Sequence, residues 1–137
     1  MANESKKQGA SYEARFTAEA LARGFDVMEP AGDYLVYDRI VVNKSDDTFR
    51  VQVKGTRYVQ PGKVSYKVLA ATGRGGVPKV KLTADDADVL AVYVDPPDVW
   101  YFIPISKITS KSVSLSPEDP NSVGKYEPWR DAWNVFA

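Results

Sequence analysis

The sequence contains no cysteine and no histidine among its 137 residues. Without cysteine there is no disulfide framework and no thiolate zinc site. Without histidine the chain lacks the commonest general base, the Ser-His and Cys-His catalytic pairs, and the usual ligand of transition metals. Any chemistry must therefore use carboxylates, amides, lysine, tyrosine or hydroxyl groups. A hard cation that prefers oxygen ligands suits this inventory best, with Mg²⁺ first and Mn²⁺ as the alternative.

Long apolar runs are also missing. No stretch approaches the roughly 18 apolar residues that a membrane span needs, and residues 1–11 are polar, without the apolar core of a secretory signal. We therefore expect a cytoplasmic protein. The length fits one domain, 1–137, with residues 1–8 disordered and residues 106–137 forming a C-terminal extension that ends in a helix.

Acidic residues are absent from one long segment, although the formal net charge of the chain is zero. Residues 48–84 contain eight basic residues and no acid, whereas the remainder holds 10 basic and 18 acidic residues. Such segregation is typical of a polyanion-binding face on an otherwise acidic protein. The other interpretation is that strand edges and loops simply carry solvating lysine and arginine, and the charges alone do not separate the two.

The order of predicted elements indicates one α/β domain built around a mixed sheet. Apolar residues recur at helical spacing over residues 9–24, where Gly24 is placed to end the helix. Strands are predicted at residues 25–28, 34–42, 49–58, 64–71, 89–94, 99–105 and 113–115. Residues 64–71 are expected to pair with 49–58, and the continuously apolar run 89–94 to be buried on both faces. A second helix is predicted over residues 126–136, with Tyr126, Trp129, Trp133 and Phe136 on one stripe. The stripe could pack on the domain's own sheet or form a subunit interface, and the first is the commoner arrangement.

Four polar residues occupy positions where packing alone favours apolar side chains. Glu13 shares the apolar stripe of the first helix, where a carboxylate is costly unless it is paired or coordinated. Asp38 interrupts a run of β-forming residues, and Gln52 and Lys54 point to one face of their strand. Each also has a plain explanation: a glutamate at the edge of the stripe, an aspartate on an edge strand or bulge, and two residues on the wet face of a half-solvated sheet.

Together the four residues suit metal-dependent phosphate chemistry. Asp38 can give Mg²⁺ a charged oxygen and the side chain of Gln52 a neutral one, with the backbone carbonyl of Val53 between them. A cation there would acidify a water molecule and offset charge at the phosphorus that the water attacks. Lys54 is placed to orient that water or to stabilise the developing charge, and Glu13 to hold a water of the metal or to fix Lys54.

These residues carry a resemblance to the PD-(D/E)XK nucleases. The matching stretches are GASYE (9–13), GFDVMEP (24–30), YDRIV (37–41) and VQVKGT (51–56), followed by AVY (91–93) and WYFIP (100–104). The chain resembles the branch with the cyanobacterial group I intron homing endonuclease and, more distantly, the archaeal Holliday-junction resolvases. The resemblance covers roughly residues 9–105. It departs from the family pattern at Tyr37, where the family has proline, and at Gln52, where the family has a second acid.

The resemblance implies a restriction-endonuclease-like fold and a Mg²⁺-dependent DNA endonuclease with Glu13, Asp38, Gln52 and Lys54 as catalytic residues. The substrate would be duplex or branched DNA. A homodimer or homotetramer is expected, because cuts on opposite strands need two sites. DNA would contact Arg57, Lys63, Lys67, Arg74, Lys79 and Lys81, and Tyr58 and Tyr66 could stack on bases. If about five phosphates are neutralised, log affinity should fall with log salt at a slope of about −4 to −5.

Two other functions remain compatible with the residues. The chain could keep the nuclease fold but have lost cleavage through Gln52, and serve as a nucleic-acid-binding or assembly domain. It could also be a small α/β interaction domain without a nucleic-acid role.

Overall fold

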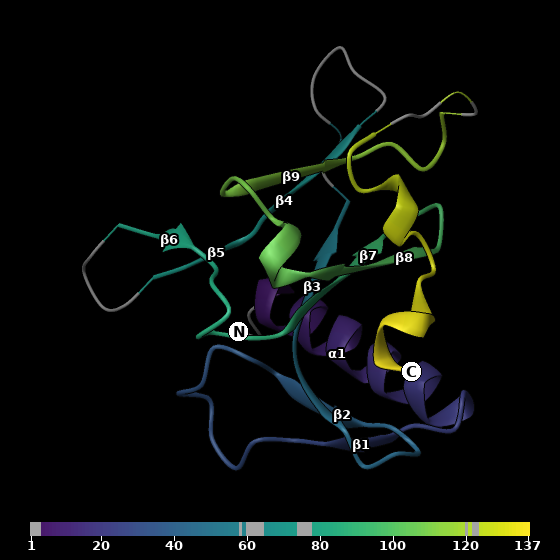
Figure 1. The fold of residues 1–137 in the computed structure, drawn as a ribbon. Helices are drawn as coiled ribbons and strands as arrows, with labels where there is room; N and C mark the ends of the chain where they lie inside the picture. The colour runs from purple at the N-terminus through teal and green to yellow at the C-terminus, as the bar shows by residue number, and fades with distance from the viewer. Residues whose placement is uncertain (1–3, 58, 60–64, 74–77, 120, 122–123) are drawn as a thin grey trace.

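The computed structural model describes residues 4–57, 59, 65–73, 78–119, 121 and 124–137. Its main feature is a five-stranded mixed sheet with one long helix, α1 (Glu4–Ala22), across it (Figure 1). The sheet has the order β1 (Asp26–Met28), β2 (Arg39–Val42), β3 (Thr48–Thr56), β7 (Val89–Val94) and β8 (Val99–Pro104). The central strand β3 is antiparallel to β2 and parallel to β7. The predicted α/β domain with a mixed sheet is therefore confirmed.

The remaining strands form two small two-stranded sheets. Strand β4 (Tyr66–Leu69) pairs with β9 (Ser112–Leu115), and β5 (Ala71–Thr72) pairs with β6 (Val80–Lys81). A short 3₁₀ helix, η1 (Ile105–Lys107), follows β8. The predicted pairing of residues 64–71 with the strand at 49–58 is wrong, because β4 pairs with β9 instead, and an isolated antiparallel bridge joins Val59 to Tyr66.

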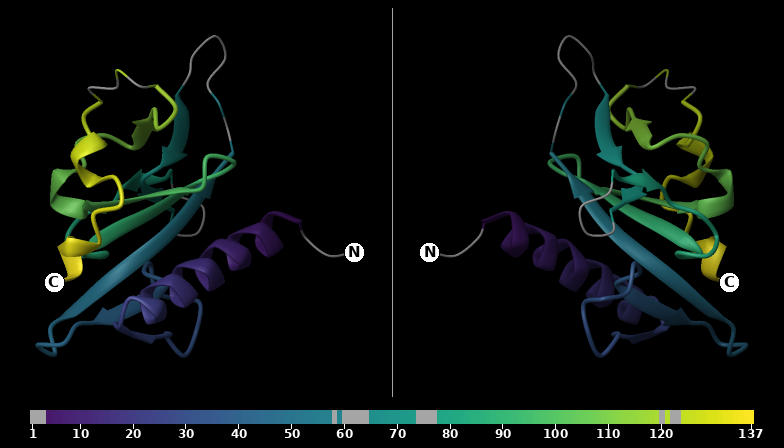
Figure 2. Two further views of the ribbon diagram at one scale, coloured as in Figure 1. Left: turned by 90° about the vertical axis from the view of Figure 1, so that its right-hand side faces the viewer. Right: turned by 90° about the vertical axis from the view of Figure 1, so that its left-hand side faces the viewer.

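The sheet separates two hydrophobic cores, one on each face. The core on the α1 side contains Phe16, Val51 and Phe102, and the opposite core contains Leu90, Tyr101 and Val113. Figure 2 shows α1 on one side of the sheet and the β4–β9 ribbon on the other. All six residues of β7 are buried, which confirms the prediction of a strand covered on both faces. None of the helices within the described residues is long and apolar enough to cross a bilayer.

Helix α1 follows the predicted apolar pattern but begins earlier. Residues 4–8 are helical rather than disordered, while residues 1–3 lie outside the described part of the chain. Tyr12, Phe16 and Ala20 are buried, but Leu21, an apolar residue of the same predicted helix, is 53% exposed. The helix ends as predicted, because Gly24 adopts a φ of 91°, a left-handed conformation that glycine reaches without strain.

The strand predicted at residues 34–42 is shorter than its composition suggests, since only Arg39–Val42 is strand. Strand β1 has three residues and pairs with Ile40, Val41 and Val42 alone. Residues 34–38 therefore have no neighbour on the β1 side, and they leave the sheet as an irregular segment. This departure brings Val36 and Asp38 against β3.

The C-terminal segment is not the predicted helix. It contains two 3₁₀ turns, η2 (Glu127–Trp129) and η3 (Trp133–Phe136), separated by a bridge between Arg130 and Tyr101 and by a positive φ at Asp131. Tyr126 and Trp129 pack on one core, whereas Trp133 and Phe136 pack on the other. The segment thus crosses the β8 edge of the sheet and closes both cores there. Packing of these aromatic residues within the domain was predicted correctly.

Candidate active site

Asp38 lies where β2 and β3 separate. Its backbone N–H donates to the carbonyl oxygen of Val51 at 2.8 Å, which adds one hydrogen bond beyond the last paired residues, Arg39 and Val51. Its carboxylate then accepts a hydrogen bond from the backbone N–H of Val53, also at 2.8 Å. The side chain of Asp38 thus satisfies a β3 donor that β2 no longer reaches. This contact holds the carboxylate against the strand that carries Gln52 and Lys54.

Gln52 is buried, at 8% exposure, and only half of its amide is satisfied. Its Nε2 donates to the carbonyl oxygen of Val36 at 3.2 Å, which fixes the orientation of the amide group. Among the described residues, nothing donates a hydrogen bond to its Oε1. A buried oxygen left without a donor costs about 1–3 kcal/mol, so a cation or a water at this position would be favourable.

Partial burial disfavours the charged forms of Glu13, Asp38 and Lys54. Burial raises the pKa of Asp38, against the opposing effects of the Val53 N–H, Lys54 and Arg39. Burial also raises the pKa of Glu13, and the nearby Asp38 raises it further, while Arg39 lowers it. Burial and Lys79 lower the pKa of Lys54, whereas Asp38 raises it. Shifts of this kind are common at functional sites, where catalytic and binding groups are partly buried beside other charges.

The four predicted site residues line one cleft. Glu13 from α1, Asp38 before β2, and Gln52 and Lys54 from β3 surround an open cavity of ≈ 350 Å³, and Val53 also lines it. Helix α1 comes very close to β3 at this point, because a Cβ atom on Gly55 would lie 2.1 Å from the ring of Tyr12. The absence of a side chain at Gly55 therefore allows α1 to bring Glu13 over the end of β3.

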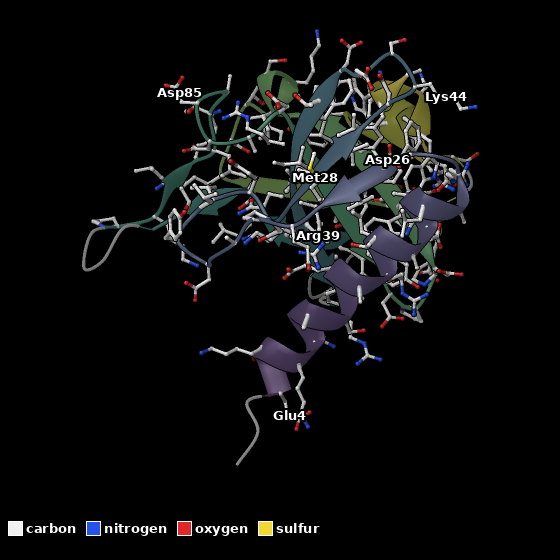
Figure 3. The ribbon with its side chains drawn as sticks, turned by 90° about the horizontal axis from the view of Figure 1, so that it is seen from below. Glu4, Asp26, Met28, Arg39, Lys44 and Asp85 are labelled. Carbon is white, nitrogen blue, oxygen red and sulfur yellow. The ribbon has the colours of Figure 1, made fainter. Side chains whose placement is uncertain are left out.

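Arg39 is a half-buried residue beside the site that the sequence did not reveal. Its side chain is 11% exposed and forms ion pairs with Glu13 at 3.3 Å and Glu29 at 2.9 Å. It also donates to the hydroxyl of Thr17 and to the backbone carbonyl of Asp38. Figure 3 shows Arg39 beside α1. One guanidinium group therefore ties the helix that carries Glu13 to the backbone of Asp38.

A basic groove adjoins the cleft. It measures ≈ 590 Å³ and shares Gln8, Lys54 and Gly55 with the cleft. Its four charged lining residues are Lys54, Arg57, Lys67 and Lys79, and none of its described lining residues is acidic. Arg57 is exposed and forms an ion pair with Asp95 at 2.8 Å.

The other predicted DNA contacts have different positions. Lys81 is not part of the groove lining and donates to the backbone carbonyl of Leu82. Lys63, Arg74 and Tyr58 lie outside the described residues. Tyr66 cannot stack on a base, because the residue is only 3% exposed and its hydroxyl donates to Glu118. That hydrogen bond and burial raise the pKa of Tyr66 to about 12.

The donor set of the cleft fits a hard divalent cation. The charged oxygens of Asp38 and Glu13 and the unsatisfied oxygen of Gln52 are the kind of ligands that Mg²⁺ or Mn²⁺ accepts, and Mg²⁺ commonly needs only one or two carboxylates. Within the described part of the chain there is no cluster of three His, Cys, Asp or Glu side chains that could hold a metal. Any metal here would depend on the neutral oxygen of Gln52 and on further ligands from water or substrate.

Comparison with known proteins identifies the family of the chain. Residues 3–136 match the PD-(D/E)XK endonuclease family. The match includes residues 106–136, which lie beyond the stretch on which the sequence resemblance rested. Nucleases of this family generally use divalent metal ions. No curated protein shows a significant sequence match.

Solved structures with a similar fold include I-Ssp6803I, a bacterial homing endonuclease. It is 22% identical, with a TM-score of 0.82 over 97% of this chain and 93% of that chain. A Holliday junction resolvase from the archaeal hyperthermophile Archaeoglobus fulgidus, Hjc, is 16% identical, with a TM-score of 0.49 over 80% of this chain and 84% of that chain. The fold and the family match define a nuclease class. The chain belongs to the PD-(D/E)XK endonuclease family and has its restriction-endonuclease-like fold.

Proposed function

We propose that this protein is a metal-dependent endonuclease that hydrolyses DNA phosphodiester bonds in the cleft between α1 and β3. The observation that carries the proposal is the unsatisfied buried oxygen of Gln52 in the same cleft as Asp38, Glu13 and Lys54. A buried oxygen without a hydrogen-bond donor needs a cation or an ordered water molecule as its partner. The family to which the chain belongs favours the cation.

Asp38 and Gln52 would hold Mg²⁺, with Mn²⁺ as a substitute and the Val53 carbonyl as a further ligand. When bound, the cation would lower the pKa of the attacking water and offset negative charge on the phosphoryl group. Lys54, whose own pKa is lowered by burial, is placed to orient that water or to donate to a phosphate oxygen. Glu13, fixed by Arg39, would accept a hydrogen bond from a water molecule of the site.

The DNA backbone would approach through the basic groove. Arg57, Lys67 and Lys79 continue the positive charge of Lys54 away from the cleft, and cations that line a groove without acids attract phosphates. The names of the two similar structures leave two substrate types open, a specific duplex sequence and a branched junction. For cuts on both strands the protein would act as a homodimer or homotetramer.

A second candidate is a nuclease-fold domain that binds nucleic acid without cutting it. Gln52 favours this reading because it replaces the family's second carboxylate and removes one charge from the metal site. Asp38 and Lys54 would then be remnants, and the basic groove would be the functional surface.

Cleavage of supercoiled plasmid and of a four-way junction in millimolar Mg²⁺ separates the two candidates. We expect the wild-type protein to nick or cut DNA with Mg²⁺ but not with EDTA. Asp38→Asn and Lys54→Met should each lower the rate by about 10²–10⁴-fold, because each removes a group that acts at the reacting phosphate. Equal cleavage by wild type and both variants would mean that the activity lies elsewhere. Tight binding of either substrate without cleavage would support the second candidate.

A further inference from the structure

The N-terminal turns of α1 extend past the sheet. Residues 4–8 are exposed, and Tyr12 is the first buried residue of the helix. Figure 2 shows this end projecting beyond the strands, and Figure 3 shows Glu4 at its free end. Helical turns that bury no side chain receive little support from tertiary packing, so their presence here needs another explanation.

A hollow lies on each side of these turns. One is the candidate active-site cleft. The other measures ≈ 560 Å³, and it shares Ser5, Gln8 and Tyr12 with the cleft. Helix α1 is therefore the wall between the two hollows. The second hollow is closed by Arg57 and Asp95, which follow β3 and β7, and by Tyr93 of β7.

The second hollow presents positive charge and hydrogen-bond donors. Lys7 and Arg15 reach it from α1, and the guanidinium of Arg15 lies 4.7 Å from the centre of the Tyr93 ring, which favours a fixed position for this charge. Of its two acids, Asp95 is paired with Arg57, and Glu4 lies at the exposed start of the helix. Ser11 and Gln8 add polar groups that can donate to an anion.

Arg57 links this hollow to the basic groove, because it lines both. The cleft, the groove and the second hollow therefore meet around the N-terminal turns of α1, and Gln8 lines all three. A phosphate chain that enters the cleft has a continuous polar surface on either side of the helix.

We propose that the hollow formed by Lys7, Arg15 and Arg57 is a second phosphodiester-binding site. It holds nucleic acid on the side of α1 opposite the cleft. This inference rests on the proposed function, since it assumes that the cleft receives DNA. The bound phosphates belong either to the strand in the cleft or to its complement, and both present the same phosphodiester oxygens.

The test is binding without metal, measured by fluorescence anisotropy of a mixed-sequence duplex in EDTA over a range of salt. The double variant Lys7→Ala/Arg15→Gln should bind roughly tenfold more weakly at physiological salt, and its log–log salt slope should fall by about 1.8, the value for two lost phosphate contacts. Arg15→Lys alone keeps the charge and should keep the wild-type slope. Lys44→Ala, at the opposite end of the molecule in Figure 3, is the matched control and should change neither quantity.

A single-stranded oligonucleotide identifies the source of the phosphates. If they belong to the strand in the cleft, the double variant loses affinity for both substrates; if they belong to the complement, only duplex binding weakens. Unchanged affinity and slope in the double variant, with normal thermal unfolding, would overturn the inference while wild-type binding and cleavage leave the proposed function standing. Failure of the wild type to bind DNA at all would overturn both.

Discussion

Gln52 has surroundings that suit an amide better than the carboxylate found in most of its family. Its NH₂ group donates to the Val36 carbonyl, a bond that a carboxylate could not make. Its oxygen is buried close to Asp38, where a second full charge would face repulsion and loss of solvent. The amide therefore destabilises the metal-free protein less than a carboxylate would at this position. It also attracts a cation less strongly.

Gln52→Glu tests this balance directly. In EDTA the variant should lose about 1–3 kcal/mol of stability, because Val36 loses its donor and an unpaired charge is buried. In Mg²⁺ the variant should recover more stability than the wild type gains, because the added charge binds the cation. Thermal unfolding with EDTA and with Mg²⁺ measures both effects.

Gln8→Glu, an exposed change on the rim of the same cleft, is the control for general acidity and should show neither effect. Equal Mg²⁺ stabilisation of wild type and Gln52→Glu would show that the Gln52 oxygen does not face a metal.

At the scale of elements, the site depends on how closely α1 packs against β3. Tyr12 of α1 lies over Gly55, and its ring packs against Tyr93 of β7 at a centroid distance of 5.7 Å. Because the atoms nearest to Gly55 belong to the body of a buried ring, no small rotamer change can make room for a methyl group. This contact limits how far α1 stands from β3, and so contributes to the position of Glu13 in the cleft.

Two alanine substitutions measure that contact. Gly55→Ala should lower the free energy of unfolding by about 1–3 kcal/mol, because it overpacks the α1–β3 contact. Gly9→Ala, in the same helix, should raise it by about 0.5–1 kcal/mol, because nothing lies within 4 Å of the added carbon and alanine is the better helix former. Urea unfolding of both variants checks the opposite signs. A Gly55→Ala variant as stable as the wild type would mean that α1 can move away from β3 without cost, and that the close approach does not constrain the site.

The same elements show what local sequence could and could not predict. The strands β3, β7 and β8 and the end of α1 follow from alternation, continuous apolar character and a glycine, all of which are local signals. The segment 34–38 is composed like a strand but has no neighbour to pair with, since β1 is too short to reach it. The segment 126–136 has helical spacing, yet its aromatic residues serve two cores on opposite faces of the sheet.

The residues of the candidate site also fall into those that local sequence could predict and those that it could not. Asp38, Gln52 and Lys54 could be found because their polarity conflicts with a local strand pattern, and Glu13 because of its phase on the helix. Arg39 could not be found, since an arginine at the start of a strand is ordinary until Glu13, Glu29 and Thr17 converge on it from distant positions. The expected stacking role of Tyr66 failed for a related reason, because its partner Glu118 lies 52 residues away.

At the scale of the whole molecule, basic residues from the acid-free segment of the sequence meet in one region of the fold. The acid-free segment 48–84 supplies β3, β4, β5 and β6, and Lys54, Arg57, Lys67 and Lys79 from it converge on the groove beside the cleft. Arg50, in the same segment, instead pairs with Asp88 near the start of β7. Positive charge from this segment is thus concentrated beside the cleft, at the end of β3.

If each chain carries one active site, the DNA cleavage products depend on the oligomeric state of the protein. A single site cuts one strand, so a double-strand break requires two subunits on one DNA. Wild-type protein should convert supercoiled plasmid to linear DNA, whereas mixing it with an excess of Asp38→Asn should make nicked circles accumulate, because mixed assemblies carry one working site. Gel analysis of the products, with sedimentation of the protein alone, measures both quantities. Monomeric sedimentation together with a linear-to-nicked ratio that the inactive variant does not change would contradict a symmetric assembly, and each chain would then cut independently.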